Sequence, residues 1–252
     1  MKTMIKNYGW VIGVILLLWF YTFVLYVHDL GNAGSGQFGD MFGAINTLFS
    51  GLAFAFVIIA LLQQQKQFER QAFETGFFEL LKLFRQNVDA LQISSQKEII
   101  SGKLVLGILK SKLESELRKL DFDENEKWSK DALEEAYGHF YKDHECRLGD
   151  YFRLLFQLMQ FVKESKCLDA QGRRRYGNLV RAGLNANELF LLYFNGLSEV
   201  GHGSRDYISR FRMFAHLNLG WAKERLLSGL YPPSAFGKQS EGAGECLNDG
   251  EG

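Results

Sequence analysis

Two long apolar stretches without any charged residue lie near the start of the chain. The first is Asn7–Val27 and the second is Met41–Gln65, with 21 and 25 residues respectively. An α-helix rises about 1.5 Å per residue, so each stretch can cross the roughly 30 Å hydrocarbon core of a bilayer. The pattern therefore predicts a transmembrane hairpin over residues 1–65, with membrane helices at about 8–27 and 41–63 and an external loop at 28–40.

Each stretch also has a simpler interpretation. Lys2 and Lys6 before the first stretch, and the small residues at 31–33 after it, are typical of a cleaved signal peptide. Its apolar core is longer and bulkier than such peptides usually have. The second stretch alone would suit a buried helix of a soluble domain. Two stretches of spanning length in tandem favour the hairpin over both alternatives.

After Gln65 the apolar positions keep a helical spacing. They recur every three or four residues, which is the pattern of an amphipathic helix packed against a core. No stretch convincingly predicts a strand. The expected fold class is therefore all-α, with a helical cytoplasmic domain over residues 66–230 after the hairpin. A polar, glycine-rich tail over 231–252 is expected to be disordered.

Apolar stripes mark the helices expected in this domain. The second membrane helix should continue without a break to about Leu91. The run Leu189–Phe194 is apolar on every side, so it should form the central helix of the core. The other stripes lie at 106–120, 128–143, 148–162, 174–197 and 208–217.

Positive charges set the expected orientation in the membrane. Lys2 and Lys6 precede the first membrane helix, Lys66 and Arg70 follow the second, and the loop between them has no lysine or arginine. The positive-inside rule then puts both termini in the cytoplasm and the loop outside. The simplest host is a bacterial inner membrane, in which the chain would be a multi-pass protein.

Composition argues against two classes of function. The chain has 29 basic residues, 29 acidic residues and three cysteines. Its balanced charge argues against broad electrostatic binding of nucleic acid, so no direct nucleic-acid binding is expected. Cysteines that are few and odd in number argue against a secreted disulfide scaffold.

Small and polar side chains interrupt the second membrane helix on roughly one face. Small residues let two helix backbones approach closely, and asparagine or serine can form a hydrogen bond across the contact. This face could pack on the first helix of the same chain, or it could form an oligomer contact or the wet lining of a pore. Its residues are Gly43, Asn46, Thr47, Ser50, Gly51 and Ala55.

Three charged residues lie inside apolar patterns of the helical domain. Arg153 interrupts the stripe at 148–162, and Arg181 and Glu188 are seven residues apart, which puts them on one face of a helix. An unpaired buried charge costs several kcal/mol. We therefore expect a buried ion-pair network among these three residues, either as a structural clamp between helices or as part of a ligand or signal pocket.

Residues arranged for catalysis are scarce. His139, His144, Glu145 and Cys146 lie close in sequence, but the two histidines are five residues apart, whereas a zinc pair on one helix face needs four. We expect no metal, no cofactor and no catalytic set, and therefore no enzyme. The run Arg173–Arg175 is either the solvated start of a helix or a contact for lipid or phosphate.

Two blocks of sequence resemble a known family. The first is GQFGDMFGAINTLFSGLAFAFVI at Gly36–Ile58, a Phe-Gly-Asp turn followed by a helix with glycine, asparagine and serine. The second combines LGDYFRLLFQLMQFV at Leu148–Val162 with YGNLVRAGLNANELFLLYFN at Tyr176–Asn195. Both are similar to the phage abortive infection proteins, a bacterial family with an N-terminal membrane hairpin and a helical cytoplasmic region. The chain departs from the family pattern at Gly183 and Asn185.

The resemblance implies defence against phage, beside a reverse transcriptase or another sensor as partner. Together with the hairpin it leads to the hypothesis of a membrane-anchored effector, whose hairpins form a homo-oligomer and disturb the inner-membrane lipid when triggered. The alternative is a membrane-tethered binding or sensor module that recruits a partner defence protein. A third reading, an anchored nuclease or hydrolase, has no catalytic set to support it.

Overall fold

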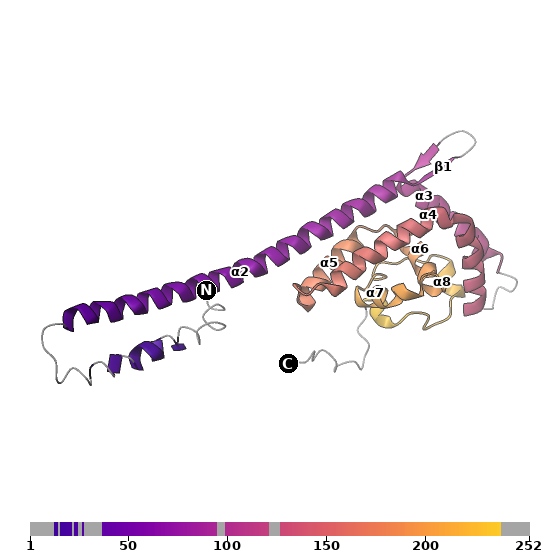
Figure 1. The fold of residues 1–252 in the computed structure, drawn as a ribbon. Helices are drawn as coiled ribbons and strands as arrows, with labels where there is room; N and C mark the ends of the chain where they lie inside the picture. The colour runs from indigo at the N-terminus through magenta and orange to yellow at the C-terminus, as the bar shows by residue number, and fades with distance from the viewer. Residues whose placement is uncertain are drawn as a thin grey trace. The chain divides into compact units, whose positions relative to one another are not determined.

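The computed structural model describes residues 13–14, 16–21, 23–24, 27, 37–94, 99–120 and 127–237. These residues are mostly helical, which confirms the predicted fold class at a coarse level (Figure 1). The chain divides into two compact units, Met1–Ala72 and Phe73–Gly252. Helix α2 (Gln37–Ala90) contributes residues to both units.

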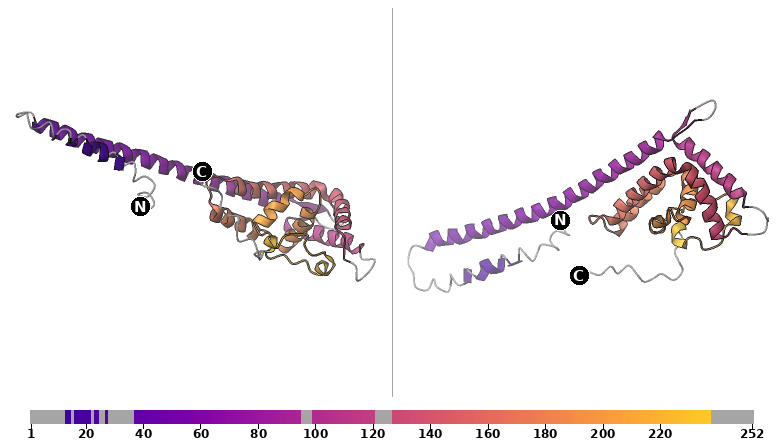
Figure 2. Two further views of the ribbon diagram at one scale, coloured as in Figure 1. Left: turned by 90° about the horizontal axis from the view of Figure 1, so that it is seen from below. Right: turned by 45° about the vertical axis from the view of Figure 1, so that its right-hand side comes forward.

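The first unit contains the N-terminal part of α2 and the described residues before it. Those between Gly13 and Val27 are helical and run beside α2 (Figures 1 and 2). Much of the predicted membrane helix at 8–27, and the loop residues 28–36, lie outside the described residues. The two-helix hairpin therefore stays a prediction. The last four residues of the predicted loop, from Gln37, already belong to α2.

One helical segment among the described residues can cross a membrane by its length and composition. It is Asn46–Ala90, and only 11% of its most apolar window is buried inside the structure. A core helix of a soluble protein passes the same test, but it would be mostly buried. The exposed apolar side chains of this segment before residue 63 are Phe49, Phe54, Phe56, Val57, Ile58, Leu61 and Leu62.

The second unit begins where α2 becomes amphipathic. Phe73, Phe77, Phe84 and Val88 are buried along one side of the helix. Gly76 lies among them, and a Cβ at this position would be 2.9 Å from Cζ of Phe161 on another helix. Glycine therefore lets the two helices pack closely at this point of the core.

A short hairpin and two long helices follow α2. Strand β1 (Gln92–Ser94) pairs antiparallel with β2 (Ile99–Ser101); strands of three residues are too short to show alternation in the sequence. Helices α3 (Lys103–Arg118) and α4 (Lys130–Glu164) pack on each other. The stripes predicted at 128–143 and 148–162 thus belong to one helix, α4, which begins after the capping side chain of Ser129.

Helix α6 (Ala186–Leu197) is the centre of the core. It packs on both α3 and α4, and every residue from Glu188 to Leu197 is buried. This confirms the central role predicted for the apolar run. Full burial of each large apolar side chain contributes about 1.5–3 kcal/mol relative to exposure, so this helix accounts for a large share of the apolar stabilisation. Helix α5 (Ala170–Ala182) precedes it and packs on α4.

Shorter elements complete the second unit. They are η2 (His202–Ser204), α7 (Arg205–Arg210), α8 (Ala222–Arg225) and η3 (Pro233–Phe236). The helix predicted at 208–217 ends at Arg210, because the backbone leaves helical geometry and Arg212 adopts a positive φ of 53°. Its apolar residues Phe211 and Phe214 are nevertheless buried.

The polar tail begins later than the sequence pattern suggested. Tyr231 and Ala235 are buried, and the Tyr231 hydroxyl donates a hydrogen bond to the backbone carbonyl of Tyr193 at 2.8 Å. The segment 231–237 is therefore part of the core, because Tyr231 and Ala235 are buried among aromatic residues of α6 and of the turns that follow it. Residues 238–252 lie outside the described residues.

Candidate functional site

Glu188 is a fully buried carboxylate at the start of α6. The single helix predicted at 174–197 is divided here into α5 and α6 by a capping box. The Asn185 side chain accepts the Glu188 N–H at 2.9 Å, and Glu188 Oε2 accepts the Asn185 N–H at 2.6 Å. This exchange satisfies two backbone donors that the helix start would otherwise leave unpaired. It also fixes the carboxylate at the turn between the two helices.

Two side chains from other helices reach this carboxylate. The buried hydroxyl of Tyr151 on α4 donates to Glu188 Oε1 at 3.3 Å, and Nζ of Lys103 at the start of α3 lies 4.0 Å from Oε2. Burial raises the pKa of Glu188 above its usual value, although the Asn185 N–H, Lys103 and Tyr151 act in the opposite direction. Burial, together with the charge of Glu188, also raises the pKa of Tyr151, so its hydroxyl remains a donor.

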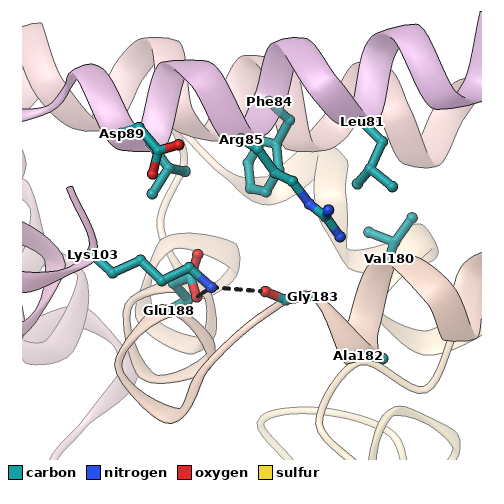
Figure 3. Close-up of a pocket in the computed structure, with 10 residues that line it drawn as sticks. Leu81, Phe84, Arg85, Asp89, Lys103, Val180, Ala182, Gly183 and Glu188 are labelled. Carbon is teal, nitrogen blue, oxygen red and sulfur yellow. Dashed lines mark hydrogen bonds and ion pairs between the residues drawn. The ribbon is translucent and has the colours of Figure 1, made fainter.

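Glu188 lines a cavity of about 410 Å³ (Figure 3). The cavity lies between the C-terminal part of α2, the start of α3 and the turn from α5 to α6. Small-molecule sites are commonly about 300–1,000 Å³ and combine apolar walls with a few convergent polar groups. This cavity has both features. Its large apolar lining residues are Leu81, Phe84, Val88 and Val180, and its charged residues are Arg85, Asp89, Lys103 and Glu188.

The two cations of the cavity differ in their partners. Nζ of Lys103 donates to the Gly183 carbonyl at 3.4 Å, in addition to its contact with Glu188. Arg85 extends from α2 toward the same turn (Figure 3), but it makes no hydrogen bond or ion pair with any described residue. A guanidinium has five N–H donors and can bind two oxygens of a phosphate or carboxylate at once. The cavity therefore contains a cation whose donors have no partner among the described residues.

The structure does not bring Arg153, Arg181 and Glu188 together as the predicted network. Arg153 is exposed and pairs with Asp150, one turn before it on α4. Arg181 Nη1 donates to the backbone carbonyl of Arg212 at 3.1 Å. Because α4 turns Tyr151 rather than Arg153 toward Glu188, a neutral hydroxyl and Lys103 occupy the place expected for the arginines.

The basic run Arg173–Arg175 lies in the first half of α5, and its three side chains differ in their surroundings. Arg173 Nη1 donates to the carbonyls of Ser165 at 3.2 Å and Leu168 at 2.8 Å, which closes the turn between α4 and α5. Arg174 and Arg175 are exposed. A contact with lipid or phosphate stays a prediction for these two residues, whereas Arg173 has a structural role.

The residues of the predicted packing face lie on two different sides of α2. Ala55 is buried within the first unit and Gly51 is half-buried, whereas Gly43, Asn46, Thr47 and Ser50 are exposed. At 3.6 residues per turn, Asn46 and Ser50 lie roughly opposite Ala55. The contact inside the unit therefore uses the small residues, and the polar side chains face away from it.

The polar residues around His144 are on α4. His139, Glu145 and Cys146 are exposed, and His144 is half-buried, where burial lowers the pKa of its imidazole. Within the described part of the chain, no group of three histidine, cysteine, aspartate or glutamate residues is placed to bind a metal ion.

Comparison with known proteins gives one match. Residues 143–220 match the model of a family described as "Putative phage abortive infection protein". This match confirms the resemblance of the second sequence block, which lies inside the matched segment, whereas the first block lies outside it. No curated protein and no solved structure matches the chain.

The segment matching the abortive infection family supplies one side of the cavity. Val180, Gly183 and Glu188 lie within residues 143–220, whereas Arg85 and Lys103 precede this segment. The sequence contained two signals for this site: the charge of Glu188 beside an apolar run, and the Asn-x-x-Glu spacing at 185–188, which is a capping signature. Arg85 and Lys103 gave no signal, because they meet Glu188 only through tertiary packing.

Proposed function

We propose that this protein is a membrane-anchored effector of bacterial anti-phage defence, acting through abortive infection. The main support is the occurrence in one chain of two features: a segment that matches the abortive infection family at 143–220, and an exposed apolar helix segment able to span a membrane. The first indicates the biological role, and the second indicates where the protein acts.

The exposed apolar surface of the first unit is suited to lipid. On α2 it includes Phe49, Phe54 and Leu61, with more than half of each side chain exposed, and Leu17 and Tyr21 before α2 are exposed to a similar extent. Apolar surface left in water costs about 25 cal/mol per Å². Many large exposed apolar side chains on one unit mark a membrane or protein contact. Lipid removes the cost without a further protein partner.

The proposed topology is a hairpin in the bacterial inner membrane with both termini in the cytoplasm. It rests on the lysine and arginine residues that flank the two apolar stretches and on their absence from residues 28–40. The second unit would then lie in the cytoplasm, where an infection signal can reach it.

Asn46 and Ser50 provide the basis for self-association. Both side chains are exposed, and neither has a hydrogen-bond partner among the described residues; Thr47, by contrast, donates to the Gly43 carbonyl at 2.8 Å. A polar group without a partner is costly in hydrocarbon. We propose that a second copy of the chain covers this side, and that triggered clustering of the hairpins disturbs the membrane and stops the infected cell.

Replacing both Asn46 and Ser50 with leucine should weaken self-association about tenfold. Interhelical hydrogen bonds in membranes contribute about 0.6–2 kcal/mol each, and the variant removes two groups that can form them. The measurement is energy transfer between donor- and acceptor-labelled copies in lipid vesicles. Phe49→Leu is the matched control, since it changes an exposed apolar residue without removing a polar group. Equal association of the double variant and the control would contradict the proposed interface.

Phage plating combined with membrane potential tests the function. Cells with the gene should give fewer plaques than cells without it for at least one phage of a broad panel, and infected cells should lose potential in a voltage-sensitive dye assay. The double leucine variant should protect less. Protection with an intact potential would contradict the membrane-disturbing step, and unchanged plating over the whole panel would contradict the defence role.

A tethered recruitment module is the alternative function. It is favoured by an apolar groove on α3 lined by Ile100, Leu104 and Ile108, beside which Ile99 is also exposed. The partner would be a defence protein such as a reverse transcriptase or another sensor. Replacement of residues 1–65 with an unrelated two-helix anchor separates the two functions: defence should persist if the module only recruits, and should be lost if the hairpin is the effector.

A further inference from the structure

We infer that the cavity between α2, α3 and the α5–α6 turn binds a small organic phosphate. Arg85 and Lys103 approach the space from two different helices, and Arg85 has no partner among the described residues (Figure 3). Two convergent cations, one of them a free guanidinium, are a recurrent means of binding a phosphate group. The inference concerns the second unit alone and does not depend on the membrane function.

Only two of the four charges in the cavity, Lys103 and Glu188, form an internal pair. Arg85 and Asp89 are one turn apart on α2, the spacing at which a helical ion pair forms easily, yet no ion pair joins them. Glu188 forms no ion pair with Arg85 either: its oxygens accept from the Asn185 N–H and the Tyr151 hydroxyl, and Lys103 lies 4.0 Å from Oε2. Arg85 therefore lines the cavity without an ion-pair partner among the described residues.

The rest of the cavity determines what else the ligand contains. The side chains of Leu81, Phe84, Val88 and Val180 form apolar walls, so the ligand should have a flat or apolar portion beyond the phosphate. Asp89 has acceptor oxygens without a partner in the described chain, which suit an amino or hydroxyl group of the ligand. A volume of about 410 Å³ admits a molecule of the size of a mononucleotide.

Calorimetric titration of the full-length protein in dodecyl maltoside micelles tests the inference. The probes are inorganic phosphate, glycerol 3-phosphate, AMP and adenosine. We expect at least one organic phosphate to bind more tightly than inorganic phosphate, and adenosine, which lacks the phosphate, to bind at least tenfold more weakly than AMP. Tighter binding of glycerol 3-phosphate would indicate a lipid headgroup as the source, and tighter binding of AMP a soluble nucleotide; either supports the site.

Variants identify the cavity as the place of binding. Arg85→Ala should lower the affinity about tenfold, the effect of losing one charge-assisted contact, and Arg85→Lys should lower it less. Because Arg85 is exposed, its replacement should leave the thermal unfolding temperature unchanged. That result would show that the variant is folded. Lys142→Ala removes an exposed cation that does not line the cavity and should leave the affinity unchanged. The inference is overturned if no phosphate probe binds at about 10 mM, or if Arg85→Ala binds as the wild type does.

Discussion

Glu188→Ala is expected to lower the free energy of unfolding by about 2–3 kcal/mol. The change removes the acceptor of the Asn185 N–H from the capping box, and it leaves the fully buried Tyr151 hydroxyl without a partner. Loss of a cap costs about 1 kcal/mol, and a buried donor without an acceptor costs about 1–3 kcal/mol. Relief of the cost of burying a charge offsets part of this sum. The measurement is denaturant unfolding of the detergent-solubilised full-length protein, followed by circular dichroism.

Glu188→Gln is the matched control, because its amide oxygen can accept from the Asn185 N–H while its NH2 group donates to the Tyr151 oxygen. It should also change the dependence on pH. Burial raises the pKa of Glu188 above 4.5, so the folded protein binds this proton more tightly than the unfolded chain does. Wild-type stability should therefore fall as pH rises from about 4.5 through the raised pKa. The glutamine variant should lack this decrease. An alanine variant as stable as the wild type would contradict the role assigned to the carboxylate.

Gly177→Ala should destabilise the second unit by about 3 kcal/mol. A Cβ at this position in α5 would overlap Cδ1 of Phe211 and lie 2.9 Å from its Cγ, and the Phe211 ring is itself buried. Overpacking of this kind typically costs about 1–3 kcal/mol, and the upper end applies where the neighbouring ring has no room to move. Thermal unfolding of the full-length protein in detergent provides the measurement.

Gly138→Ala is the contrasting substitution on α4. Gly138 is exposed, and a Cβ there would meet no atom within 4 Å. Alanine is favoured over glycine in a helix by about 1 kcal/mol, so this variant should be more stable than the wild type. If Gly177→Ala also raised stability, the close packing of α5 against Phe211 would be refuted.

The pattern of apolar positions was sufficient to predict the helices that bury them. The stripe from Leu148 to Val162 predicted the buried face of α4, and the run Leu189–Phe194 predicted the central helix. Both predictions depend on repeated apolar positions, and burial of those positions is the dominant contribution to folding. The same reasoning wrongly predicted one helix in place of α5 and α6. The apolar spacing continues across Gly183, whereas the backbone starts a new helix after the capping residue Asn185.

The candidate site could be predicted only in part. Glu188 was identified because a carboxylate inside an apolar pattern must have partners, but the partners themselves were wrong. Arg153 points outward and pairs within its own helix, while Lys103 and Tyr151 reach Glu188 from α3 and α4. Apolar periodicity predicts on which side of its own helix a residue lies. It does not predict how a neighbouring helix is rotated about its axis, and therefore which side chains of that helix face the residue. The cavity and its free Arg85 follow from that rotation.

The burial of Tyr231 and Ala235 has a consequence for the order of folding. Tyr231 contacts the aromatic rings of Tyr193 and Phe214, with ring centroids 5.0 Å and 4.9 Å apart. The core around α6 is therefore incomplete until residue 235 has left the ribosome, whereas α2 emerges much earlier and can partition into lipid during synthesis. In the proposed topology the nascent chain is anchored before its most apolar internal helix is enclosed, and for that interval α6 would depend on the rest of the partly folded unit, or on a chaperone, to avoid aggregation.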